Sequence, residues 1–86
     1  MKLVITLNQN ELRLEIRQKG RVIDFETASY YHDLSDVLIT ILDKLLKRNS
    51  IDTTALNSFK IQGNTGENGT SYKIAAAFIE GLKVGV

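Results

Sequence analysis

The sequence has no cysteine, no proline and no tryptophan, and only one histidine among its 86 residues. Without cysteine, disulfide bonds and thiolate metal sites are excluded. A zinc site with a single histidine would need carboxylate ligands, and no spacing of the acidic residues suggests such a set. We therefore expect a small domain that binds no metal and no cofactor.

Long apolar runs are also missing. No segment approaches the roughly 20 apolar residues of a membrane span, and the apolar part of Met1–Leu7 is too short for a signal peptide. These observations predict a cytoplasmic protein without a membrane partner.

Charge of one sign is missing as well. The net charge is +1, and lysines and arginines are scattered except for a short cluster at Lys44, Lys47 and Arg48. Nucleic-acid-binding proteins usually show a basic stripe or patch. We interpret the cluster as a solvated helix end whose cations favour the helix dipole, and we expect no direct nucleic-acid contact.

The first part of the chain has the pattern of three strands. Lys2–Leu7 is rich in β-branched residues, and Glu11–Gln18 alternates apolar and charged residues, which predicts a half-buried antiparallel strand. Arg21–Glu26 follows after a turn at Lys19–Gly20. Strands joined by such short turns predict a meander.

The period then changes to three and four residues. Apolar residues recur on one face from Leu34 to Leu46, which predicts a helix whose start Asp33 or Ser35 can cap. A short fourth strand, Ser58–Gln62, follows this helix.

A glycine-rich loop, Gly63–Gly69, leads into a last helix that begins at Thr70 and is apolar almost all the way round. The N-terminus of a helix can hold an anion. The loop lacks the Gly-Lys-Ser/Thr ending of a P-loop, and Glu67 would repel a phosphate, so we favour a structural turn. The possible anion-binding residues are Gly66, Gly69, Thr70 and Lys73.

The order of elements is therefore β-β-β-α-β-α. A right-handed crossover through the first helix would place the fourth strand parallel to the first and beside it, in a mixed sheet with two helices. No linker, repeat or low-complexity tract interrupts the chain, so we expect one domain over residues 1–86. This α/β order is that of half of an actin-like, ribonuclease-H-like fold.

Two motifs connect the sequence to a known family. Ile41–Leu46 looks like the family motif L-I-D-E-L-L. In the last third, Gly63, Thr70 and Lys73 fall on the first glycine, the threonine and the arginine of the pattern G-x-G-P-G-S-F-T-G-L-R, whereas residues 65–69 depart from it. By these motifs the chain resembles the N-terminal half of the TsaB (YeaZ) family, the non-catalytic member of the bacterial machinery that makes threonylcarbamoyladenosine on tRNA. The family's strand-one aspartate is replaced by Thr6, and the family's C-terminal half is absent.

These departures argue against an enzyme. Actin-like ATPases place a metal-organising aspartate where Thr6 stands, and a neutral hydroxyl is a poor ligand for a hard cation. His32 has no nucleophile or paired carboxylate arrangement around it, and we interpret it, with Tyr30 and Tyr31, as a packing cluster at the helix entry. The resemblance implies instead a non-catalytic interaction module, partner of a TsaD-type subunit in tRNA threonylcarbamoyladenosine modification.

The two helices suggest how a partner would bind. The last helix is apolar on all sides, and such a helix must be buried on several of them. In the helix predicted from Leu34 to Leu46, Ile39 lies off the main apolar face. Small domains without disulfides or metals often gain this burial in oligomers. We expect a homodimer, or a heterodimer with a TsaD-type protein, since TsaB-like proteins pair through the same helices. The predicted interface residues are Leu38, Ile41, Leu42, Leu45, Ala75, Ala76, Phe78 and Ile79.

Two alternatives stay open. The chain could be a small nucleotide- or phosphate-binding protein that uses residues 63–73, or a homodimer of unrelated role that shares the fold.

Overall fold

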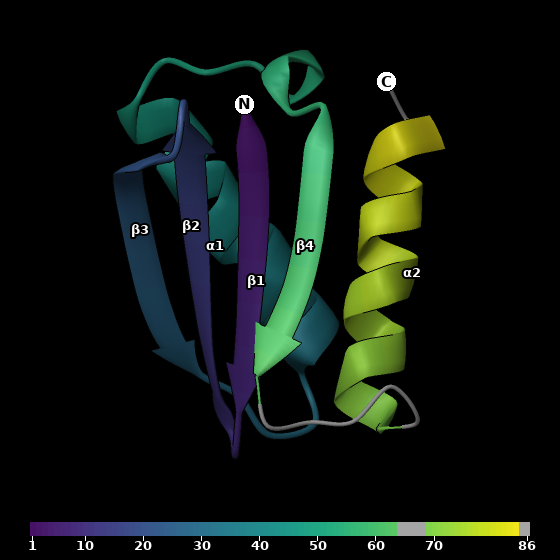
Figure 1. Cartoon of the computed structure of the whole chain (residues 1–86). Helices are drawn as coiled ribbons and strands as arrows, with labels where there is room; N and C mark the ends of the chain where they lie inside the picture. The colour runs from purple at the N-terminus through teal and green to yellow at the C-terminus, as the bar shows by residue number, and fades with distance from the viewer. Residues whose placement is uncertain (64–68, 85–86) are drawn as a thin grey trace.

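The computed structural model describes residues 1–63 and 69–84 (Figure 1). Its elements are β1 (Lys2–Asn8), β2 (Glu11–Gln18), β3 (Arg21–Ser29), α1 (Leu34–Arg48), the short 3-10 helix η1 (Thr53–Ala55), β4 (Ser58–Gly63) and α2 (Thr70–Val84). The predicted order β-β-β-α-β-α is confirmed. Strand β3 continues to Ser29, beyond the predicted end at Glu26. Neither described helix has the length and apolarity needed to cross a bilayer.

The four strands form one mixed sheet in the order β3-β2-β1-β4. Strand β1 is antiparallel to β2, with Ile5 opposite Leu14, and parallel to β4, with Ile5 opposite Ile61. The chain reaches β4 through α1, as a parallel connection requires. The fourth strand therefore lies beside the first and parallel to it, as the crossover rule predicted.

Both helices pack on the same face of the sheet. The inward side chains of β1 and β2 form a single core with apolar residues of α1 and α2, and the opposite face carries no helix of the described chain (Figure 1). The buried members of this core are Leu3, Ile5, Leu7, Leu12, Leu14, Ile16, Tyr30, Leu34, Leu38, Ile41, Leu42, Leu45, Leu46, Leu56, Ala75 and Ile79.

The turn between β2 and β3 sets the register of the hairpin. Lys19 and Gly20 both adopt positive φ, 55° and 78°. Two successive residues in this region match a type I′ turn, whose twist suits antiparallel strands. The register is interrupted once, near Arg17, so that Ile16 faces Asp24 while Arg17 faces Val22. This irregularity inserts Ile23 into the edge strand.

The start of α1 differs from the prediction. Asp33 occupies the cap position, but its carboxylate makes no cap hydrogen bond to the helix. It accepts instead from the backbone N–H of Tyr31 at 3.1 Å, while the Asp33 carbonyl accepts from Val37 at 3.0 Å. Ser35 lies inside the helix. The carboxylate thus orders the entry loop rather than the first turn.

Gly63 ends β4 in a conformation that requires glycine. Its φ is +127°, and a Cβ built there would overlap the backbone carbonyl of Leu7, its partner on β1. The first glycine of the loop therefore serves the close approach of two strands.

We predict that Gly63→Ala destabilises the domain by more than about 1 kcal/mol, because the added methyl group cannot fit without moving β4 away from β1. Gly81→Ala is the matched control: it lies inside α2, where a Cβ would meet open space, and should stabilise the domain by about 0.5 to 1 kcal/mol. Urea unfolding followed by circular dichroism measures both. Equal stability of the two variants would contradict the packing role of Gly63.

Candidate functional site

Six of the eight predicted interface residues lie inside the core of the chain. Leu38, Leu45 and Ala75 have no exposed surface, and the other three, Ile41, Leu42 and Ile79, are only 4 to 6% exposed. These six pack against the sheet and the facing helix, so they offer almost no surface to a partner while the domain is folded. Their burial corrects the choice of interface residues made from the helical pattern.

The other two predicted residues, Ala76 and Phe78, line two shallow hollows beside α2. The first hollow, of about 190 Å³, lies between α1 and α2. Ile39, also on α1, is 57% exposed there, which confirms that it lies off the buried face. Apolar side chains dominate the lining: Ile39, Leu42, Leu46, Phe78 and Leu82.

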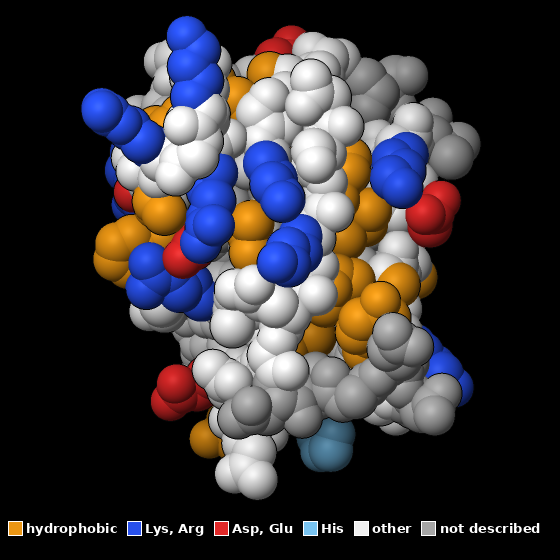
Figure 2. Space-filling model, viewed as in Figure 1, with side chains coloured by type: hydrophobic (Ala, Val, Ile, Leu, Met, Phe, Trp, Pro, Cys, Tyr) orange, Lys and Arg blue, Asp and Glu red, His pale blue; other side chains and the backbone are white. Residues whose placement is uncertain are grey.

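The second hollow, of about 200 Å³, lies between α2 and the edge strand β4. Figure 2 shows hydrophobic side chains exposed between the sheet and this helix. The apolar and aromatic residues of its lining are Phe59, Ile61, Tyr72, Ala76 and Ile79. Lys83 lies at its rim, with its Nζ 5.7 Å from the centre of the Phe59 ring. Helix α2 is thus covered by its own chain on one side and borders open apolar hollows on two others.

The predicted anion site lies only partly within the described chain. Gly66 is outside the described residues, whereas Gly69 and Thr70 form the start of α2. The backbone N–H of Lys73 donates to the carbonyl of Gly69 at 3.1 Å, and the Lys73 side chain is exposed. The anion site remains a prediction.

Thr6, where the sequence resemblance implied an aspartate, is a strand residue on the uncovered face of the sheet. Its hydroxyl accepts a hydrogen bond from the Gln62 side chain at 3.0 Å. In residues 1–63 and 69–84, no group of three histidine, aspartate or glutamate side chains could hold a metal ion.

The prediction that His32, Tyr30 and Tyr31 pack together at the helix entry is wrong for two of these three residues. Tyr30 is buried, and its hydroxyl lies 3.3 Å from the Asn8 carbonyl oxygen and 3.2 Å from Ser71 Oγ. Tyr31 is 74% exposed and His32 is also exposed. Of these three residues, Tyr30 ties the helix entry to α2.

Two of the three cations of the basic cluster of α1, Lys44 and Arg48, pair with acidic residues of β3, whereas Lys47 pairs within its own helix. Arg48 makes a two-point contact with Asp24, at 2.8 and 2.9 Å, and reaches Glu26 at 2.9 Å, while Lys44 lies 3.4 Å from Glu26. The hydrogen bonds from Arg48 lower the pKa of Asp24 to about 2 and also lower the pKa of Glu26. Lys44 and Arg48 therefore take part in an ion-pair network between α1 and β3. Sequence reasoning missed this network because the partners of these two cations are more than 15 positions away.

No protein-family model matches the sequence, and no curated protein matches it. Among solved structures, the chain is similar to YeaZ from Pseudomonas aeruginosa, with a TM-score of 0.74 and 17% sequence identity. The similarity covers 98% of this chain and 38% of the YeaZ chain, so the chain spans well under half the length of that protein. The comparison confirms the YeaZ-like fold that the sequence motifs implied.

The Arg48 network predicts a pH dependence of stability. A carboxylate whose pKa is lowered in the folded state stabilises that state above the pKa of the unfolded chain, close to 4, and loses this effect as the pH falls toward the folded value. We expect the unfolding free energy of the wild type to fall between about pH 5 and about pH 2. Arg48→Met should make this dependence shallower, because the pKa of Asp24 returns toward its ordinary value.

Urea unfolding across this pH range measures the effect. Lys47→Met is the control, since it removes a cation from the same helix end and leaves the contacts of Asp24 and Glu26 intact. Identical pH slopes for the wild type and Arg48→Met would show that the network does not stabilise the fold.

Proposed function

We propose that the chain is a non-catalytic interaction module resembling TsaB, which partners a TsaD-type subunit in tRNA threonylcarbamoyladenosine modification and pairs through α1 and α2. The observation that best supports this is the similarity to YeaZ, which extends over 98% of the chain at a TM-score of 0.74. The sequence motifs at Ile41–Leu46 and residues 63–73 point in the same direction.

The surface between the two helices suits a protein partner. Ile39 exposes 57% of its surface, and Phe78 and Leu82 are only partly buried in the hollow beside it. Fully burying an exposed aliphatic or aromatic side chain contributes about 1.5 to 3 kcal/mol, so a few such residues can anchor an interface. The rim residues Asp43 and Thr53 are polar, as the periphery of an interface usually is.

The position of Thr6 supports a role without phosphoryl transfer. Its neutral hydroxyl is engaged by Gln62 where a metal-organising carboxylate would be needed. A module of this kind would act by binding and positioning its partner.

We predict that the wild type is dimeric in solution and that Ile39→Asp or Phe78→Asp raises the dimer dissociation constant at least about tenfold, equivalent to about 1.4 kcal/mol. A charge buried at the centre of an apolar interface leaves an unpaired carboxylate away from water. Light scattering on purified protein gives the mass, and circular dichroism confirms folding. Ile41 is not a suitable position because it is nearly buried in the core.

Thr40→Asp is the matched control, because it places the same charge on an exposed position of α1 that does not line the hollow. It should leave the mass of the dimer unchanged. If the wild type is monomeric, binding to a purified TsaD-type protein becomes the test, with the same variants expected to weaken it. A monomer that fails to bind such a protein would contradict the proposal.

A further inference from the structure

The uncovered face of the sheet collects basic side chains that are scattered in the sequence. Lys2 on β1, Arg13 and Arg17 on β2, and Lys60 on β4 all lie on this face, as the pairing of the strands requires. Figure 2 shows Lys and Arg side chains gathered over the sheet. We call this surface the basic face.

The register places these cations in adjacent rows. Lys2 pairs with Arg17 on one side and with Ser58 on the other, and in the next row Lys60 pairs with Val4. Val4 points away from the core cluster and still has no exposed surface, so its polar neighbours must cover it. The long basic side chains therefore lie along the sheet and leave their charged ends at its surface.

A single buried carboxylate holds two of the arginines in place. Glu15 is 6% exposed, and it accepts from Arg13 Nε at 2.7 Å and from Arg17 Nε at 2.8 Å. The guanidinium of Arg13 also lies over the exposed ring of Phe25, 4.0 Å from its centre. Two guanidinium groups share one carboxylate, so the group keeps an excess of positive charge, and both arginine side chains remain 38 to 40% exposed.

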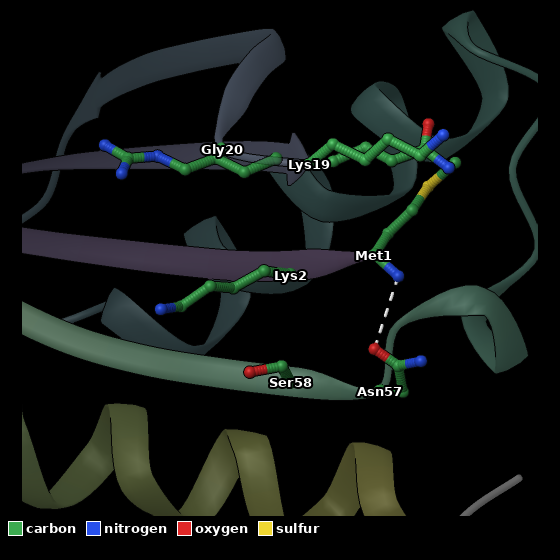
Figure 3. A pocket seen from close by; sticks show the side chains of 8 residues that line it. Met1, Lys2, Lys19, Gly20, Asn57 and Ser58 are labelled. Carbon is green, nitrogen blue, oxygen red and sulfur yellow. Dashed lines mark hydrogen bonds between the residues drawn. The ribbon is translucent and has the colours of Figure 1, made fainter.

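One end of the basic face opens into a hollow of about 430 Å³ beside the turn between β2 and β3. Lys2, Arg17 and Lys19 line it together with the polar residues Asn57 and Ser58, and none of the described residues in its lining is acidic. Figure 3 shows Lys2 between the strand that carries Ser58 and the turn that carries Lys19 and Gly20.

In the rest of the described chain, acidic side chains outnumber basic ones. The acidic residues of β3, Asp24 and Glu26, point toward α1 and pair with its cations. With Lys19 of the turn, the basic face holds five of the chain's eleven cationic residues, whereas the described strands contribute only Glu11 and Glu15 to it. Although the net charge is only +1, the positive and negative side chains are thus distributed unevenly over the surface.

We propose that the basic face binds the phosphate backbone of a nucleic acid. This departs from the expectation drawn from the scattered lysines and arginines of the sequence, because the fold gathers them. From Arg13 to Arg17 the surface extends about 14 Å along β2, at about 3.4 Å per residue. That length corresponds to roughly four nucleotides of a stacked strand with a rise of 3.4 Å.

The composition of the face favours phosphates over bases as the recognised groups. Phe25 is the one aromatic residue on the described strands of this face, and one side of its ring already stacks against the guanidinium of Arg13. Binding should therefore depend strongly on salt and weakly on base sequence. The proposal does not rest on the pairing of α1 and α2, which form the other layer of the molecule.

We expect the wild type to bind a short fluorescein-labelled single-stranded RNA in an anisotropy titration, with affinity falling steeply between about 50 and about 200 mM salt. The triple variant Lys2→Gln, Lys19→Gln, Lys60→Gln should bind at least about tenfold more weakly at the lower salt concentration. Its log–log salt slope should be smaller in magnitude by about 2, since each neutralised phosphate of a single strand contributes about 0.7.

The control is Lys44→Gln, Lys47→Gln, Lys83→Gln, which removes the same number of charges from the helices. It should bind within about twofold of the wild type, and thermal melting should show both variants folded. Absence of binding by the wild type, or equal losses in both variants, would overturn the proposal. Displacement of the RNA by polyglutamate as effectively as by unlabelled RNA would also overturn it, because the face would then recognise acidic polypeptides.

Discussion

Strand β1 organises both faces of the molecule, because it is the one strand that pairs with an antiparallel and with a parallel neighbour. Its inward residues Leu3, Ile5 and Leu7 are fully buried under the two helices. Its outward residues Lys2 and Thr6 lie on the opposite face. A slip of one residue in this strand would exchange the two sets, so the same register that closes the core also assembles the basic face.

The structure contains two networks of arginine–carboxylate ion pairs, one of which leaves no excess positive charge whereas the other does. Arg48 bonds to Asp24 and Glu26, so one cation meets two carboxylates and the contact ties α1 to β3 without leaving positive charge. Glu15 bonds to Arg13 and Arg17, so one carboxylate meets two cations within a single strand. The first network contributes to holding the layers together. The second orders two guanidinium groups on a surface that nothing in the described chain covers.

Helix α2 is apolar on nearly every side, but its residues differ in burial because each side of the helix has different neighbours. Ala75 and Ile79 face the core, and Phe78 borders the hollow shared with α1. Ala77, on the same helix, is exposed. A helical pattern that is apolar on every side cannot distinguish these positions, and two of the four interface residues predicted on α2, Ala75 and Ile79, proved to be internal. The clean alternation of β2, by contrast, identified its buried apolar side chains correctly and missed only the burial of Glu15 on the opposite face.

The sequence alone determined the order of the elements, their approximate bounds and the parallel placement of β4 beside β1. These features depend on local period, turn residues and the handedness of a crossover, and all of them can be read along the chain. The YeaZ-like fold followed from the same order and from two short motifs. Only the tertiary structure decided which charges are neutralised and which collect on one face. The partners of Arg48 are distant in sequence, and Lys2, Arg17 and Lys60 become neighbours only through the pairing of three strands.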